Sequence, residues 1–162
     1  MNTAPSFPLT LYTVGHSNLT ADAFLTLLRQ HHITTLVDVR SAPYSKYVPH
    51  FGKRELEAFL QEHDVFYRYA GEVLGGRPKQ ADVYKNSAVP DQDTKREDFR
   101  ELVQYEEIMK RDWYQKALRH LLTIVRDEST SGGRVAIMCS EANPLECHRH
   151  HLITRSLLDP HV

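Results

Sequence analysis

The run ITTLVDVR at residues 33–40 decides the fold. It is β-branched and almost continuously apolar, which is typical of a strand buried on both faces of a parallel sheet. A helical pattern with Thr20 as its N-cap precedes this run and extends to His31. Before that helix, residues 9–15 (LTLYTVG) have the character of a short strand. The opening therefore predicts strand–helix–strand, a connection that is right-handed in nearly every parallel sheet.

The same alternation continues along the chain. Residues 53–63 have a helical apolar face, and VFYRY at 65–69 has the pattern of a third strand. Residues 70–93 are rich in Gly, Pro, Asp and Asn and predict a long connection, which in a compact domain tends to be functional or disordered. Capping boxes that begin at Thr94 and at Asp112 each predict the start of a helix. The second of these helices is expected to end near residue 127.

The C-terminal part adds one more strand and one more helix. RVAIMC at 134–139 predicts the strand. Asn143 as N-cap, Pro144 in the first turn and Glu146 as capping-box partner predict a helix at about residues 144–158. Alternating strands and helices argue for an α/β fold. We therefore predict a single domain over residues 1–162, with a tail at 1–8 and an open, mostly parallel sheet covered by helices, its strands near 9–15, 33–40, 65–69 and 134–139.

Composition narrows the class of protein. A chain of 162 residues with 41% hydrophobic and 25% charged residues has the size and make-up of one ordinary globular domain. Its formal charge of −1 gives no broad attraction to nucleic acid or membrane. The two cysteines, Cys139 and Cys147, are too few for a secreted disulfide scaffold. The N-terminus lacks a secretory signal, and no apolar run is long enough to span a membrane. We therefore expect a cytoplasmic protein with reduced thiols.

Polar residues gather where three of the predicted strands end. Ligands of open parallel sheets bind beyond the carboxyl ends of the strands. If the strands are parallel, their ends meet at one edge of the sheet, so we expect a site there. The residues concerned are His16 and Ser17 after the first strand, Asp38 and Arg40 at the end of the second, and Cys139 and Glu141 at the end of the fourth.

Arg149 has an unusual position in the last predicted helix. By helical phase it shares the apolar face with Leu145, Leu152 and Ile153 and points toward the sheet. A buried arginine needs a partner, because an unpaired buried charge is very costly. Asp38 lies within an apolar strand and has the same need. Two arrangements stay open: Asp38 pairs with Arg149, or Arg149 and Arg40 together hold an anionic ligand near the helix N-terminus.

Four stretches of the chain resemble one family: LYTVGHSN, LVDVRSAPYS, the LGG of 74–76 and CSEANPLECHR. Together they are similar to the pattern of the uncharacterised family called domain of unknown function 488 (DUF 488), over about residues 11–158. The resemblance implies an α/β fold with a cluster of polar residues at one end, and it implies no reaction. The matching positions are Gly15, His16, Ser17, Asp38, Arg40, Pro43, Ser45, Phe51, Gly75, Gly76, Cys139, Glu141, Pro144, Cys147, His148 and Arg149.

Our leading hypothesis is an enzyme-like domain that binds a small anionic, phosphate-bearing ligand. Arg40 and Arg149 are the candidates for holding the anion, and the ligand-binding set also includes Ser17, Asp38 and Ser45. Cys139, Glu141 and His16 are the candidates for catalysis. A cysteine between a strand end and a helix N-terminus can be a nucleophile, and carboxylates at strand ends can act as acids and bases. The structural alternatives are that Cys139 packs as a small apolar residue and Glu141 caps a turn.

Two further classes of function stay open. Cys139, Cys147, His148 and His16 have the donor types for zinc or iron. Their spacing fits no standard zinc finger, and neighbours such as Cys147 and His148 diverge by about 100° on a helix. Alternatively, the basic and aromatic stretch at 40–54, together with GEVLGGRPK at 71–79, suggests a nucleic-acid-binding module. The sequence indicates no particular cofactor or oligomeric state.

Overall fold

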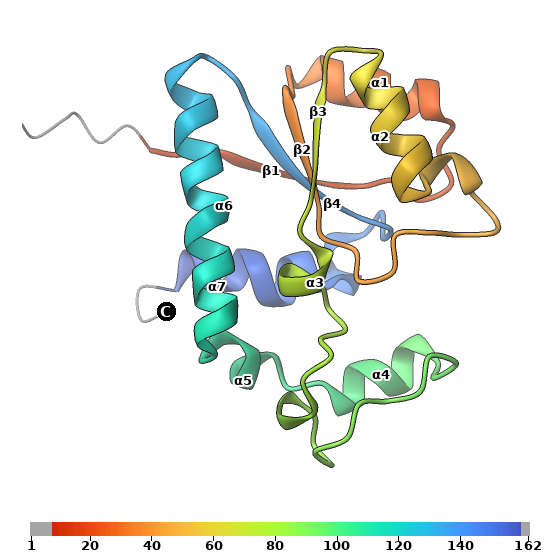
Figure 1. The fold of residues 1–162 in the computed structure, drawn as a ribbon, viewed down its shortest axis with the longest axis vertical. Helices are drawn as coiled ribbons and strands as arrows, with labels where there is room; N and C mark the ends of the chain where they lie inside the picture. Colours follow the sequence, from red (N-terminus) through yellow and green to blue (C-terminus); the bar gives the residue numbers. More distant parts are fainter. Residues whose placement is uncertain (1–7, 160–162) are drawn as a thin grey trace, which may run out of the picture.

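The computed structural model describes residues 8–159 and contains a four-stranded sheet with helices on both faces (Figure 1). The strands are β1 (Leu11–Gly15), β2 (Thr35–Asp38), β3 (Phe66–Tyr69) and β4 (Val135–Cys139). Their order is β1-β4-β2-β3, and every neighbouring pair is parallel. The predicted α/β fold is therefore confirmed, with each strand slightly shorter than its expected range. The predicted tail at 1–8 lies outside the described residues, apart from Pro8.

The sheet separates two apolar clusters. Helices α1 (Ala21–Gln30) and α2 (Lys53–Gln61) cover one face, and α6 (Asp112–Thr130) covers the other (Figure 1). Because successive side chains of a strand point to opposite faces, Leu36 packs with the α1–α2 cluster and Val37 with the α6 cluster. The central strands are buried on both sides, which explains the nearly unbroken apolar runs in the sequence.

The helices begin where the sequence indicates, but not all of their caps are those expected. Thr20 caps α1 as predicted, since its hydroxyl accepts a hydrogen bond from the amide of Ala23 at 3.1 Å. Helix α4 (Arg96–Leu102) follows Lys95, not Thr94, and α6 follows Arg111. Neither of those two N-caps makes a side-chain capping bond, so both predicted capping boxes are wrong. Helix α6 also runs past residue 127, to Thr130.

The connection predicted at 70–93 contains short helical turns. Helix α3 (Gly71–Leu74) follows β3 directly, and a 3-10 turn covers Ala81–Val83. Helices α4 and α5 (Tyr105–Met109) then lie below the sheet, beyond the carboxyl ends of β2 and β3 (Figure 1). Among residues 8–159, no helix combines the length and apolar character that a membrane crossing requires.

The C-terminal segment is not one helix. Residues Pro144–Glu146 form a 3-10 turn, Arg149–Thr154 a π-helix and Arg155–Leu158 the short helix α7. Between the first two, Cys147 has an extended backbone with φ −129° and ψ 144°. The prediction of a continuous helix at 144–158 is therefore wrong. The interruption changes the helical phase, so Leu145 is 61% exposed while Leu152 and Ile153 are buried.

Candidate functional site

The ends of three strands meet at one edge of the sheet. The amide of His16, just after β1, donates to the carbonyl of Cys139 at 3.0 Å, and the amide of Ser17 donates to Ser140 at 2.9 Å. The amide of Val39, just after β2, donates to Met138 at 3.0 Å. Gly15 allows this close approach, since a Cβ there would lie only 1.6 Å from the carbonyl oxygen of Glu141.

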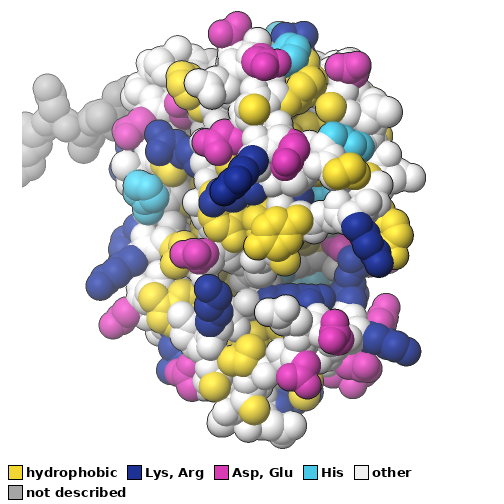
Figure 2. Space-filling view, turned by 45° about the vertical axis from the view of Figure 1, so that its right-hand side comes forward, with side chains coloured by type: hydrophobic (Ala, Val, Ile, Leu, Met, Phe, Trp, Pro, Cys, Tyr) yellow, Lys and Arg dark blue, Asp and Glu magenta, His cyan; other side chains and the backbone are white. Residues whose placement is uncertain are grey.

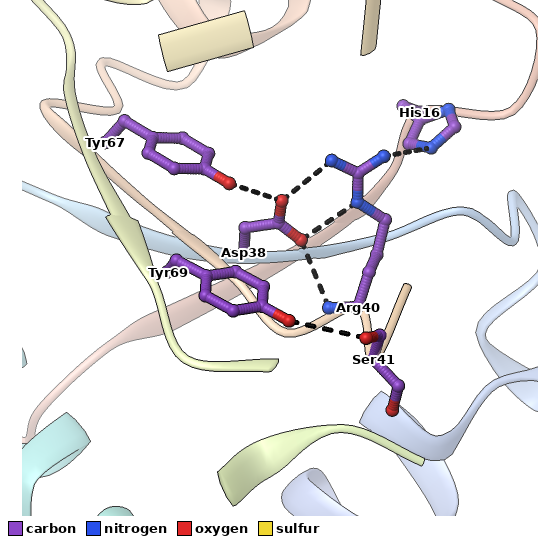
Figure 3. Close-up of polar contacts among 6 residues, drawn as sticks. All are labelled: His16, Asp38, Arg40, Ser41, Tyr67 and Tyr69. Atoms are coloured by element: carbon purple, nitrogen blue, oxygen red, sulfur yellow. Dashed lines mark hydrogen bonds and ion pairs between the residues drawn. The ribbon is translucent and has the colours of Figure 1, made fainter. Parts of the chain in front are cut away.

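A buried polar network links β3, β2 and β1 at this edge (Figure 3). The carboxylate of Asp38 accepts from Arg40 Nη2 at 2.7 Å, from Arg40 Nε at 2.9 Å and from the Tyr67 hydroxyl at 2.6 Å. The amide of Arg40 also donates to Asp38 at 3.1 Å. The chain turns after β2, so the side chain of Arg40 folds back onto Asp38. The predicted pairing of Asp38 with Arg149 is therefore wrong, because Arg40 occupies that place.

The other side of Arg40 faces His16. Arg40 Nη1 lies 3.2 Å from His16 Nε2, and His16 Nδ1 lies 2.7 Å from the carbonyl of Ser17. A guanidinium can only donate and a carbonyl can only accept, so Nδ1 carries the proton and Nε2 accepts. Burial lowers the pKa of His16, and the charge of Arg40 lowers it further. The His16 ring, which stacks on Phe51 at 4.3 Å, is therefore a neutral acceptor that orients Arg40.

Arg149 is buried as predicted, with 2% exposure, although it lies in a π-helix and not in a continuous helix from residue 144. Its Nη2 donates to the carbonyl of Ala142 at 3.2 Å. Within the described part of the chain, its Nε and Nη1 have no hydrogen-bond partner. Ser45 also has a local role, because its hydroxyl accepts from the amides of Tyr47 at 3.1 Å and Val48 at 3.4 Å. Its hydrogen bonds shape the turn before α2.

Cys139, Cys147 and His148 form a buried cluster at the end of β4. The two sulfur atoms lie 3.8 Å (Cys139) and 3.7 Å (Cys147) from Nδ1 of His148. The expectation that Cys147 and His148 diverge is wrong, because Cys147 is extended and not helical. A hydrogen bond between the thiols, with Cys147 donating, lowers the pKa of Cys139 well below its ordinary value. The same bond and burial raise the pKa of Cys147.

A cavity of about 260 Å³ opens beside this cluster. Figure 2 shows Lys and Arg side chains along a hollow in the lower half of the molecule. The lining residues are Arg40, Ser41, Ala42, Gly76, Arg77, Arg96, Phe99, Arg100, Tyr105, Cys139, Ser140, Glu141, Glu146, Cys147 and His148. The lining thus combines strand ends, the Cys–Cys–His cluster, the Gly76–Arg77 segment and residues of α4.

The arginines of the cavity differ in their partners. Arg40 is paired with Asp38, and Arg96 holds Glu141 through two contacts of 2.7 Å. Arg77 lies over the ring of Phe99 at 4.5 Å, and Arg100 donates to the carbonyl of Glu146. Among residues 8–159, neither Arg77 nor Arg100 has a carboxylate within ion-pair distance. These two charges are available to a ligand.

The sequence-predicted residues divide into two groups. Arg40, Cys139 and Glu141 line the cavity, together with Cys147 and His148. His16, Ser17, Asp38, Ser45 and Arg149 do not line it. Sequence reasoning missed Arg96, Arg100 and Tyr105 on α4 and α5. Arg77 lies in the GEVLGGRPK stretch at 71–79 that the sequence indicates as part of a nucleic-acid-binding module. The spacing of Arg96 and Arg100 by four residues was a weak signal, because paired charges on a polar helix are usually solvated.

The chain was compared with known proteins. The family model described as Domain of unknown function DUF488 matches residues 20–156, which is most of the chain. No curated protein and no solved structure matches it.

Proposed function

Since this chain belongs to the family described as domain of unknown function DUF488, whose description names no reaction, we propose its function from the geometry of the site. The protein is an enzyme-like domain that binds a small, phosphate-bearing anion in the cavity at the carboxyl ends of the strands. The observation that carries this proposal is the pair of guanidinium groups, Arg77 and Arg100, that face the cavity without a carboxylate partner among the described residues. Guanidinium groups bind phosphate and carboxylate oxygens with strong, directed hydrogen bonds.

The remaining residues of the site have distinct parts in this proposal. Arg40 is held by Asp38 and His16, so it lines the cavity as a fixed hydrogen-bond donor whose charge Asp38 balances. The hydroxyl of Ser41 accepts a hydrogen bond from the amide of Arg77 at 2.9 Å and thereby positions the Gly76–Arg77 segment. Cys139 is the reactive candidate, because its thiol lines the cavity. His16 is a positioning residue that acts through Arg40, and Glu141 holds α4 through Arg96.

A titration calorimetry experiment with inorganic phosphate, pyrophosphate and sulfate tests the proposal. Arg77→Gln and Arg100→Gln are each expected to weaken binding by about 10- to 100-fold, the effect of losing a charged hydrogen bond. Arg126→Gln is the matched control, because Arg126 is exposed on α6 and does not line the cavity. The proposal fails if none of these anions binds, or if the three variants and the unaltered chain bind equally.

A second function, binding of single-stranded nucleic acid, is favoured by a different surface. Tyr44 and Tyr47 are 75% and 83% exposed in the loop before α2, and Lys46 Nζ lies 5.2 Å from the Tyr47 ring. Exposed aromatic rings beside basic groups can stack bases and contact phosphates. Binding of an oligonucleotide that weakens steeply with salt and is lost in Tyr47→Ala supports this function. Absence of binding at low salt removes it.

We propose that the protein works in the cytoplasm, and its cysteines support this location. The described cysteines, Cys139 and Cys147, are free thiols, and such thiols persist in a reducing compartment.

A further inference from the structure

Three metal-ligand atoms converge at the end of β4. The Sγ atoms of Cys139 and Cys147 and the Nδ1 atom of His148 all lie within 4.8 Å of one another, and all three residues are buried. The sulfur–nitrogen distances are 3.8 Å and 3.7 Å. In a tetrahedral zinc site with Zn–S of about 2.3 Å and Zn–N of about 2.0–2.1 Å, two such ligands are about 3.6 Å apart. The two sulfur–nitrogen distances thus nearly match two edges of a zinc tetrahedron, and the two sulfur atoms lie within 4.8 Å of each other.

The orientation of His148 supports the same reading. Its Nε2 lies 3.1 Å from the carbonyl of Val39. A carbonyl only accepts, so Nε2 carries a proton and donates it, and in the neutral ring Nδ1 has a free electron pair directed at the two sulfur atoms. Histidines that bind metals in proteins almost always donate their other ring N–H to a carbonyl or carboxylate in this way.

The backbone is arranged to bring these neighbours together. Cys147 is extended between a 3-10 turn and the π-helix Arg149–Thr154, so its side chain and that of His148 point to one place. Single-turn π segments are rare in proteins, and those that occur often lie at functional sites. Gly76 leaves room for the imidazole, because a Cβ there would lie 2.8 Å from Cγ of His148.

We propose that Cys139, Cys147 and His148 bind a zinc ion through Sγ, Sγ and Nδ1, with the fourth position open to the arginine-lined cavity. Two thiolates and an imidazole are ligands that suit Zn²⁺, whereas magnesium and calcium prefer oxygen. Three protein ligands with one open position are typical of catalytic zinc sites, and four are typical of structural sites. When bound, such an ion can activate water or polarise a ligand oxygen.

Charge connects the zinc site to the cavity. When both cysteines bind a metal as thiolates they carry two negative charges, and a divalent ion cancels them. Arg77 and Arg100 can then attract an anion to the open position without opposition from the cluster. This part of the inference, the occupant of the fourth position, rests on the proposed function. Zinc binding by the three side chains does not depend on it.

Zinc binding is tested on the full chain, purified under reducing conditions. After exposure to Zn²⁺ and dialysis, mass-spectrometric metal analysis is expected to find one zinc per chain. Cobalt substitution is expected to give the charge-transfer absorption of cobalt–thiolate bonds, which identifies sulfur ligands without any substitution in the protein. The inference is overturned if the folded, reduced chain retains no stoichiometric zinc, or if cobalt binds without a thiolate band.

Variants identify the ligands. His148→Gln and Cys147→Ser are expected to weaken zinc binding. The loss should exceed the factor of about 10 to 100 that substitutions outside the ligand set cost. Competition with a chromophoric chelator measures the affinity. His150→Gln is the matched control, because His150 belongs to the same segment and lies outside the cluster. Circular dichroism checks that each variant folds. Equal affinity in His148→Gln and His150→Gln contradicts the assignment.

The two proposals can fail separately. Arg77→Gln is expected to keep stoichiometric zinc while its phosphate binding weakens by about 10- to 100-fold. Zinc retained in a chain that binds no phosphate, pyrophosphate or sulfate supports the metal site and removes the anion function. Phosphate binding with full affinity by a chain that retains no zinc supports the anion function and removes the metal site.

Discussion

Asp38 and Arg40 are two residues apart and form an ion pair inside the protein, with hydrogen bonds of 2.7 Å and 2.9 Å between their side chains. Asp38 is 0% exposed and Arg40 is 3% exposed. Tyr67 donates to the carboxylate on one side, and Arg40 donates to His16 on the other. The strand-end edge is therefore held by a chain of hydrogen bonds that leaves each charged member with a partner.

Asp38→Asn is expected to destabilise the protein strongly. The substitution leaves the guanidinium of Arg40 buried without its counter-charge, and removing one partner of a buried ion pair costs about 3–5 kcal/mol. Urea unfolding followed by circular dichroism measures the loss. Asp91→Asn, at an exposed position, is the control and is expected to change the unfolding free energy by less than about 0.5 kcal/mol. Similar stability of the two variants contradicts the importance of the pair.

Arg149→Met is expected to keep or increase stability and to leave phosphate affinity within about twofold, since two of its nitrogen atoms are buried without a partner in the described chain. A buried unsatisfied group costs about 1–3 kcal/mol, and the substitution removes two of them. Arg40→Met, by contrast, leaves the buried carboxylate of Asp38 without its counter-charge and is expected to be destabilising. Loss of phosphate binding in a folded Arg149→Met chain instead restores the sequence hypothesis that Arg149 holds the anion.

Gly76→Ala is expected to lower zinc affinity by about 10- to 100-fold while the chain stays folded, because outer-shell displacement of a ligand has that cost. The added Cβ would meet the ring of His148 at 2.8 Å. Gly132→Ala is the control, since a Cβ there meets nothing within 4 Å. Its left-handed backbone, φ +81°, makes that variant less stable by about 1–2 kcal/mol without a change in zinc affinity. Unaltered zinc affinity in Gly76→Ala contradicts a role of Gly76 in placing the His148 imidazole.

Zinc is expected to stabilise the folded chain. A ligand that binds only the native state raises the unfolding free energy by about 2.7 kcal/mol when its free concentration is 100 times the Kd. Urea unfolding with and without Zn²⁺ measures this increase, which should disappear in Cys147→Ser. An equal increase in that variant indicates that zinc acts elsewhere on the protein.

His16 is expected to be neutral at pH 6.5, where an ordinary histidine is about half protonated. Burial lowers its pKa in the folded chain, so the unfolded chain takes up the proton first as the pH falls. The contribution of His16 to stability is therefore complete above the ordinary pKa and declines below it, toward the folded pKa. Nitrogen NMR of the ring checks the protonation state. A ring half protonated at pH 6.5 contradicts the arrangement with Arg40.

Much of the fold was predictable because its signals are local. The apolar run at 33–40 indicated a strand of a parallel sheet, and the sheet contains it at Thr35–Asp38. The break of the predicted helix after Glu146 was not predictable from its N-cap, because the side chain of Asn143 does accept a hydrogen bond from the amide of Leu145, as an N-cap residue does. Tertiary contacts then decide the rest: the imidazole of His148 reaches Val39 and Arg149 enters the interior. An uninterrupted helix does not place both residues there.

The candidate site was predictable only in part, for a similar reason. Strand ends converge by topology, which brought Arg40, Cys139 and Glu141 to one cavity. Arg96 and Arg100 line the cavity from α4. Their spacing by four residues places them on one face of that helix but does not indicate that the helix lies below the sheet. The partner of Asp38 was missed because helical phase pointed to Arg149, whereas a turn after β2 returned Arg40 to the carboxylate.

The position of β4 between β1 and β2 has a consequence for how the protein is made. β1 pairs with β4, so residues 11–15 leave the ribosome long before residues 135–139 exist to receive them. Contacts so distant in the chain slow folding, because a large loop must close before they form. A polypeptide whose synthesis stops before Val135 has neither β4, which joins β1 to β2, nor Cys139, Cys147 and His148. Completion of the sheet and assembly of the cluster are therefore one late event.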